Sequence, residues 1–230
     1  FSLKVLKGEA DPLVGATCHV FNADGSGTGV SGATDSNGTV TFELSAGPYR
    51  FRMDYLGYRF WSDSFDVPDA VSGVMTIPHR DVAVALTGEY PTTPLSGVPT
   101  YLFTPEGNFL NQSLTTAANG LAVYRLPNAA FKIRADYLGY PFWSETFQGE
   151  EVSIAIRRGT ALIHARRGGV GVAGATVHLF SEGGSYLGQS QTSDAEGKAV
   201  FITPNQVYMF RVDSGGRQYW SPPVHITAGA

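Results

Sequence analysis

Short alternations of apolar and polar residues fill the chain, and no stretch repeats apolar residues with the period of a helix. Between Ala16 and Phe21, for example, alternation places Ala16, Cys18 and Val20 on one face of an extended strand. This face is the smaller and more apolar one, so we expect it to point inward, with Cys18 as an inert core residue. The same analysis predicts further strands at Leu3–Leu6, Tyr49–Met53, Val82–Leu86, Phe131–Ala135, Ala161–His164 and Tyr208–Val212.

Turn residues separate these strands at regular intervals. The segment Thr34-Asp35-Ser36-Asn37-Gly38 is typical of a hairpin turn with glycine at a positive φ. Many short strands with turn signals between them are the pattern of a β-sandwich. The sequence therefore predicts an all-β protein.

The chain also repeats itself. The nine residues from Asp54 to Ser62 recur from Asp136 to Ser144, and a weaker copy runs from Asp213 to Ser221. These copies start 82 and then 77 residues apart, and two sets of glycines keep the same spacing. Three landmarks in one register indicate internal duplication. The glycines are Gly15, Gly97 and Gly174, and Gly38, Gly120 and Gly197.

We therefore predict three tandem β-sandwich domains at residues 1–79, 80–157 and 158–230. Copy one has an apolar strand near its end at Gly73–Ile77, and copy two has one at Val152–Ile156. Copy three reaches Ala230 after Val224–Thr227 without a counterpart, so its closing strand is expected to be missing. An open sandwich edge exposes unpaired backbone groups. We expect a strand from another copy, added head to tail, or further sequence of a longer chain to cover it.

The repeats resemble a known superfamily. Each combines a strand, a Gly-Ala-x-Val-like segment, a Thr-Asp-x-x-Gly-like turn and an apolar strand, followed in copy one by Gly-Pro-Tyr-Arg-Phe and a Gly-Tyr. This order is similar to that of carboxypeptidase regulatory-like and Cna-B-like (prealbumin-like) domains, over essentially the whole chain. The resemblance implies Greek-key, Ig-like or prealbumin-like sandwiches, common in bacterial surface proteins, pilins and stalks.

Many Cna-B-like domains carry an internal Lys–Asn isopeptide bond helped by an acidic residue. Lys4 lies in the first strand of copy one, but copies two and three have only apolar or small residues there. The family's Glu-x-x-Ala-Pro-x-Gly-Tyr element is replaced by Asp-Tyr-Leu-Gly-Tyr. We therefore predict no such crosslink.

Composition narrows the classes of function. Charged residues make up 16% of the chain and the net charge is −4, which gives no basic field for nucleic acid. No apolar run is long enough to span a membrane. Cys18 is the only cysteine, so neither an intrachain disulfide nor a thiolate metal cluster is expected. The chain begins at Phe1, which predicts a processed chain or a segment of a longer one; we expect an extracellular or cell-surface location.

Catalytic motifs are missing from the sequence. It contains no His-Glu-x-x-His, no Gly-x-Ser-x-Gly and no phosphate loop. His19 and His178 occupy equivalent outward strand positions and are expected to be exposed strand residues. We predict that the chain is not an enzyme.

Three equivalent aspartates are the candidate metal ligands. Asp54, Asp136 and Asp213 each stand at a strand end before a glycine-containing turn. A carboxylate in such a place caps backbone amides, or it ligates calcium together with a loop carbonyl and a carboxylate of the next copy. Both interpretations stay open, and calcium is the one cofactor that the sequence suggests.

Aromatic residues follow each aspartate and have two interpretations. Repeated aromatic residues suit repeated interfaces between domains, and exposed ones also stack on sugar rings. We therefore expect a structural or adhesive stalk or filament that binds copies of itself. The alternative is an array of carbohydrate-binding modules that binds glycans, and a further one is an accessory fragment of an enzyme. The residues are Tyr55, Tyr58, Trp61, Tyr137, Tyr140, Trp143 and Trp220.

Overall fold

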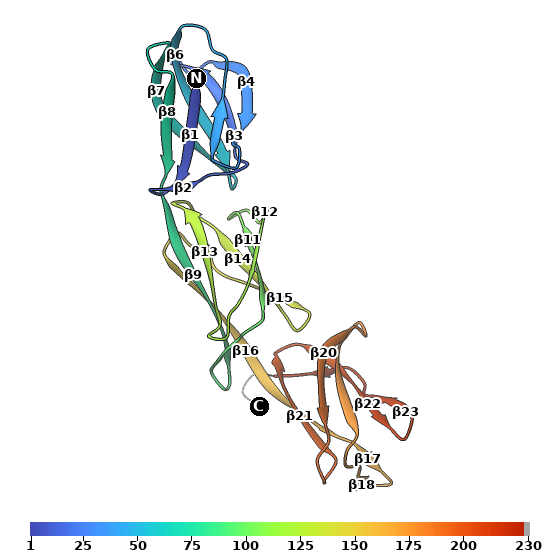
Figure 1. Ribbon diagram of the computed structural model, residues 1–230. Helices are drawn as coiled ribbons and strands as arrows, with labels where there is room; N and C mark the ends of the chain where they lie inside the picture. Colours follow the sequence, from blue (N-terminus) through green and yellow to red (C-terminus); the bar gives the residue numbers. More distant parts are fainter. Residues whose placement is uncertain (228–230) are drawn as a thin grey trace.

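The computed structural model of the chain describes residues 1–227, which contain twenty-four strands and no helix. Their buried side chains form three separate clusters, between Leu3 and Ile77, between Val82 and Ile156, and between Ala161 and Ile226. We call the residues around these clusters unit 1, unit 2 and unit 3. The units follow one another end to end (Figure 1). The chain is all-β, as the alternation predicted.

Unit 1 packs two sheets against each other. One has the order β2-β1-β5 with β8 beside β1, and the other has the order β4-β3-β6-β7. The strands are β1 Ser2–Lys7, β2 Asp11–Pro12, β3 Thr17–Asn22, β4 Gly27–Ala33, β5 Thr39–Thr41, β6 Gly47–Tyr55, β7 Tyr58–Val67 and β8 Ser72–Ile77.

Unit 2 repeats this arrangement. Strands β10, β9, β16 and β13 form one sheet, and β12-β11-β14-β15 form the other. The strands are β9 His79–Glu89, β10 Thr93–Pro94, β11 Pro99–Phe103, β12 Phe109–Thr115, β13 Leu121–Pro127, β14 Lys132–Tyr137, β15 Tyr140–Trp143 and β16 Glu151–His164.

Unit 3 starts with the second half of β16, which pairs with β21. Its other sheet has the order β20-β19-β22-β23, with β24 beside β22 and a separate β17-β18 pair nearby in sequence. The strands are β17 Arg166–Arg167, β18 Val170–Gly171, β19 Thr176–Ser181, β20 Tyr186–Thr192, β21 Lys198–Pro204, β22 Val207–Ser214, β23 Arg217–Trp220 and β24 Val224–His225.

Successive units are joined without a loop. Strand β8 ends at Ile77 and β9 begins at His79, so a single residue separates the end of unit 1 from the start of unit 2. Strand β16 runs through the second junction without a break: Glu151–Arg157 pair with β9 of unit 2, and Arg158–His164 pair with β21 of unit 3 (Figure 1). The boundaries expected at residues 79/80 and 157/158 therefore fall inside strands.

The last strand of units 1 and 2 pairs with the first strand in parallel. In unit 1, β8 pairs with β1 from Ser2↔Ser72 to Lys7↔Ile77. In unit 2, the first half of β16 pairs with β9 from Glu151↔Ala83 to Arg157↔Glu89. Between residues 158 and 227, no strand pairs with β16 in this way. The closing strand that copy three was expected to lack would begin among residues 228–230, outside the described part of the chain.

The predicted inward face of β3 is buried. Ala16, Cys18 and Val20 have exposed fractions of 4%, 0% and 1%. Gly38 has a φ of +73° in its turn, and an added Cβ would lie 2.6 Å from the carbonyl oxygen of Val5. Burial raises the pKa of the Cys18 thiol to about 12, so the one cysteine is an unreactive core residue. No helix long and apolar enough to span a membrane occurs in residues 1–227.

A buried hydroxyl fastens the loop before β11 in unit 2. The Thr116 hydroxyl accepts a hydrogen bond from the backbone N–H of Val98 at 3.0 Å and donates one to the carbonyl of Leu95 at 2.6 Å. In unit 3 the Ser193 hydroxyl makes the same two bonds, and in unit 1 the Thr34 hydroxyl accepts the equivalent bond from the N–H of Ala16. Because each hydroxyl is buried, water cannot take its place in these bonds.

We predict that Thr116→Val, which keeps the shape of the side chain, lowers the free energy of unfolding by about 1–3 kcal/mol, because it leaves a buried N–H and carbonyl unpaired. Chemical denaturation of the full chain measures the change. Thr115→Val, at the exposed neighbouring position, is the control and should have almost no effect. Equal stability of both variants would show that the hydroxyl does not fasten the loop.

Candidate functional site

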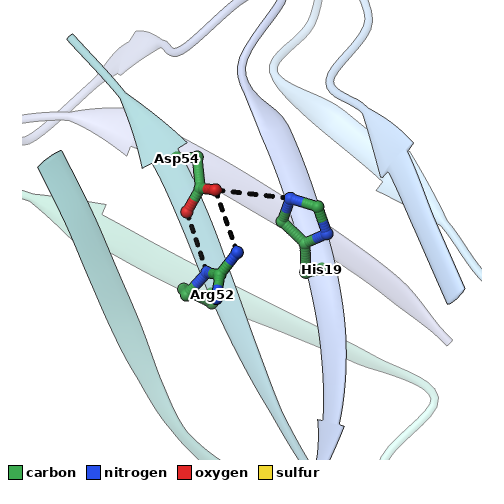
Figure 2. Close-up of polar contacts among 3 residues, drawn as sticks. All are labelled: His19, Arg52 and Asp54. Carbon is green, nitrogen blue, oxygen red and sulfur yellow. Dashed lines mark hydrogen bonds and ion pairs between the residues drawn. The ribbon is translucent and has the colours of Figure 1, made fainter. Parts of the chain in front are cut away.

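An arginine and an aspartate lie side by side on the outer face of β6. Arg52 and Asp54 are two residues apart, so they share one face of the strand. The Arg52 Nε lies 2.8 Å from Asp54 Oδ1, and Nη2 lies 3.0 Å from Oδ2. His19 reaches the same carboxylate from β3, with Nε2 3.4 Å from Oδ2 (Figure 2).

The pair recurs at the equivalent place in the other units. Arg134 and Asp136 on β14 approach to 2.9 Å between Nε and Oδ1, and the well-aligned hydrogen bond runs from Nη2 to Oδ2 at 3.0 Å. In unit 3, Arg211 donates to Asp213 at 2.9 Å through both nitrogens. His178 lies 3.3 Å from Asp213, as His19 does from Asp54, whereas unit 2 has Tyr101 at this position.

Each arginine also lies against aromatic rings. Arg52 stands 5.2 Å from the centre of the Phe21 ring, and Phe21 packs edge-on against Trp61 with ring centres 4.8 Å apart. Both contacts are of the kind that cations and aromatic pairs favour. We call this surface the aromatic–arginine face. Its members are Phe21, Arg52, Asp54 and Trp61 in unit 1, Phe103, Arg134, Asp136 and Trp143 in unit 2, and Phe180, Arg211, Asp213 and Trp220 in unit 3.

The three tryptophans do not lie at junctions between units. Trp61, Trp143 and Trp220 keep 43%, 46% and 47% of their surface exposed. Each contacts a phenylalanine of its own unit. One part of each indole is held in place, while the remainder is open to a ligand.

The neighbouring arginine of each of the three aspartates limits their ability to bind a metal ion. Asp54, Asp136 and Asp213 each face an arginine instead of a second carboxylate. Calcium is held by six to eight oxygen ligands, most often including several carboxylates. Among residues 1–227, no group of three or more histidine, cysteine, aspartate or glutamate side chains is arranged to hold a metal ion. Calcium binding would require the carboxylate to leave its arginine, and it stays a prediction.

The hairpin between β6 and β7 lies at the first junction. Its two turn residues, Leu56 and Gly57, have φ angles of +48° and +79°, as a type I′ turn requires. Tyr58, directly after the turn, donates its hydroxyl hydrogen to the carbonyl of Ala130 in unit 2. Its ring packs edge-on against Phe131 with centres 5.5 Å apart. Leu56 and Tyr58 thus pack against the core of unit 2.

The second junction repeats these contacts. Leu138, with a φ of +47°, and Tyr140 pack against the core of unit 3. Tyr140 donates a hydrogen bond to the Val207 carbonyl at 2.6 Å, and its ring centre is 5.6 Å from that of Tyr208. We call the residues 56–58 and 138–140 the plug hairpins. In unit 3 the same position is Gly215-Gly216-Arg217, which has neither the leucine nor the tyrosine.

Tyr55 and Tyr137 precede the plug hairpins and are half-buried. Tyr55 packs against the core of unit 1 and approaches His79, at the start of β9, with ring centres 5.7 Å apart. Tyr137 packs against the core of unit 2. Burial raises the pKa of Tyr55, and it also raises the pKa values of Tyr58 and Tyr140, where Glu106 and Glu182 add smaller effects. These phenols stay neutral donors at physiological pH.

Two groups of residues were missed by the sequence patterns. The arginines were overlooked, although Arg-x-Asp recurs in all three copies as Arg52-Met53-Asp54, Arg134-Ala135-Asp136 and Arg211-Val212-Asp213. This repetition could have indicated that each aspartate is paired with the arginine two residues before it. Leu56 and Leu138 were also missed, because leucine at a turn position with positive φ is rare and gives no pattern of its own.

No family model matches the chain, and no curated protein matches it. Among solved structures, it is similar to the TIE protein of Bacillus anthracis at 17% identity, with 99% of this chain and 48% of that chain covered and a TM-score of 0.29. The chain thus spans about half of that protein.

Two pilins show comparable similarity. The minor pilin GBS52 of Streptococcus agalactiae has 14% identity, with 67% of this chain and 94% of that chain covered and a TM-score of 0.33. BcpA, the major pilin subunit of Bacillus cereus, has 12% identity, with coverages of 98% and 93% and a TM-score of 0.28.

The calcium hypothesis is tested by chelation. If Asp54, Asp136 and Asp213 ligate calcium, excess chelator should lower the melting temperature of the protein, because an ion that binds only the folded state stabilises it. Calorimetry with and without added calcium measures the shift. The triple Asp→Asn variant is the matched control and should no longer respond to calcium. Unchanged melting of the wild type in excess chelator would leave the aspartates as partners of arginine only.

Proposed function

We propose that the chain is a rigid, rod-like segment of an extracellular or cell-surface structural protein, such as a stalk or filament, built from Cna-B-like sandwiches. The observation that carries the proposal is the doubled connection at each junction. The backbone passes from one unit to the next with at most one residue between strands, and a plug hairpin packs against the following core. Flexible tethers have the opposite design, with long stretches rich in glycine and serine.

The strained backbone conformation of the two leucines in the plug hairpins supports a rigid junction. A leucine in the left-handed region is less stable than a glycine there by about 1–2 kcal/mol. Both Leu56 and Leu138 adopt this conformation, and both pack against the next unit. Strain of this kind persists where surrounding contacts offset it. The contacts of the junction therefore outweigh the preference of the turn.

A buried arginine adds to the second junction. Arg158 lies in the middle of β16 and is 6% exposed. It donates hydrogen bonds to the carbonyls of Glu89 and Pro91 and, at 2.8 Å, to the Thr93 hydroxyl. The loop at the far end of unit 2 is thereby tied to the strand that enters unit 3.

We predict that Leu56→Gly combined with Tyr58→Ala broadens the distance distribution between unit 1 and unit 2, while each unit stays folded. Spin labels at Glu43→Cys and Glu145→Cys, both exposed, report the distance by pulsed electron paramagnetic resonance. Cys18 is fully buried and should not take up the label.

The matched control is Arg217→Ala, which alters the equivalent hairpin of unit 3 and should leave this distribution unchanged. Circular dichroism confirms that both variants are folded. A distribution that is already broad in the wild type would contradict a rigid rod.

The aromatic–arginine face favours a second function, binding of carbohydrate. Its three tryptophans are half-exposed and fixed from one side, beside charged groups able to hydrogen-bond a sugar. An indole held in this way is suited to stacking on a pyranose ring. Three equivalent sites along one rod would bind a long polysaccharide with increased avidity.

For this function, the triple variant of Trp61, Trp143 and Trp220 to alanine should lose binding to any polysaccharide that retards the wild type in affinity electrophoresis. Melting should fall only moderately, because the side chains are half-exposed. Tyr90→Ala removes an exposed aromatic residue elsewhere and is the control. If no polysaccharide of a broad panel retards the wild type, the carbohydrate function is ruled out and the rod remains.

A further inference from the structure

Within residues 158–227, the second half of β16 has no strand along one edge, which we call the open edge, whereas its counterparts in units 1 and 2 have one. Three residues mark the same position in the first strand of each unit, because the backbone N–H of each donates to the carbonyl of a turn glycine. The pairs are Val5 with Gly38, Leu86 with Gly120, and Ala165 with Gly197. This relation aligns β1, β9 and the second half of β16. Strands β1 and β9 are each covered by a parallel strand, and between residues 158 and 227 nothing pairs with β16 on that side.

Within residues 158–227, two backbone amides on this edge have no strand to pair with. Ala165 donates to the carbonyl of Gly197, on the side of β21, so alternation turns the amides of Leu162 and His164 to the opposite side. In unit 2 the residue equivalent to Leu162 is Ala83, whose amide donates to the Glu150 carbonyl at 2.8 Å. The open edge thus has the same donors as the occupied one.

A cavity lies at the position that an isoleucine fills in the other units. Ile77 pairs with Lys7 and is 1% exposed, and Ile156 pairs with Gly88 and is fully buried. Arg167 is the equivalent of Lys7 and Gly88. It lines a cavity of about 260 Å³, together with His164, Ala165, Arg166, Val172, Val212, Ser214 and Tyr219.

The hydrogen bond of Val172, another residue of this lining, supports the alignment of unit 3 with unit 2. Val172 donates its N–H to the carbonyl of Ala165, as Leu95 does to that of Leu86. Leu95 is 5% exposed in the core of unit 2, whereas Val172 is half-exposed. The cavity is therefore the part of the unit 3 core that a closing strand would cover.

We propose that this groove holds a closing strand parallel to β16, with aliphatic side chains at every second residue, and that this strand is the polypeptide following Thr227. In units 1 and 2 the closing strand is the segment next in sequence after the second sheet. In unit 3 the chain arrives at the start of the uncovered edge: a Cβ on Gly159, three residues before Leu162, would lie 2.0 Å from the Thr227 carbonyl oxygen. A strand that follows Thr227 therefore enters the groove at its start and runs in the direction of Glu151–Arg157.

The test uses the closing strand of unit 2 as the probe. A labelled peptide with the sequence of residues 151–157 should bind the 230-residue chain with one-to-one stoichiometry, measured by fluorescence anisotropy. It should slow hydrogen exchange at the amides of Leu162 and His164. A peptide with aspartate in place of Ile154 and Ile156 should bind at least tenfold more weakly. Equal binding of both peptides, or no binding of either, would contradict the proposal that the groove holds a closing strand.

A second protein tests the source of the strand. In it, the sequence of residues 151–157 follows Thr227 directly, in place of residues 228–230. This chain should protect Leu162 and His164 without added peptide and should no longer bind it, and its version with the two aspartates should behave like the original chain. Fast exchange at both amides in the extended chain would contradict the proposal. If light scattering shows instead that the original chain dimerises through this edge and that the peptide separates the dimer, a second copy is the occupant and the proposed source is wrong.

The proposed rod and the proposed closing strand can fail separately. A broad distance distribution between units 1 and 2 would contradict the rigid rod and would leave the peptide-binding result unaffected.

Discussion

The parallel pairing between the first and last strands of a unit is the interaction on which the rest of the molecule depends. Strand β8 closes unit 1 by lying along β1, and it leads after one residue into β9, which opens unit 2. The first half of β16 closes unit 2 in the same way and continues as the first strand of unit 3. Each core is therefore completed by a strand that also fixes where the next core begins. The contacts of both plug hairpins depend on this connection, because a hairpin can pack against the next core only if the short backbone link holds that core close to it.

The plug hairpins show how the junctions differ from the rest of the surface. A type I′ turn favours glycine or asparagine at its first position, and unit 3 has Gly215 there. Units 1 and 2 have Leu56 and Leu138, which strain the turn but pack against the neighbouring core. The hairpin of unit 3 ends in Gly215-Gly216-Arg217, so any connection beyond this unit uses contacts other than those of the two internal junctions.

Much of the fold could be predicted from the sequence, since two-residue alternation and turn glycines are local signals. The buried face of β3 and the turn at Gly38 are examples. The continuous junction could not be predicted in the same way, because Arg157, Arg158 and Gly159 interrupt the apolar alternation. The sequence therefore predicted two strands, Val152–Ile156 and Ala161–His164, where the structure has the single strand β16. The site was predicted in part. Alternation placed the aspartates at strand ends, but only the distance between two side chains shows that Asp54 is held by Arg52 and not by a turn amide.

The parallel arrangement of terminal strands has a mechanical consequence. When the ends of a unit are pulled apart, β1 and β8 are drawn in opposite directions along their own axes, because the chain enters at one end of the pair and leaves at the other. Their hydrogen bonds are perpendicular to this force, so they are loaded in shear and must break together instead of one after another. The register holds six residue pairs in unit 1 and seven in unit 2. A chain built in this way resists extension most strongly along its own axis, the direction in which a tether between two surfaces is loaded.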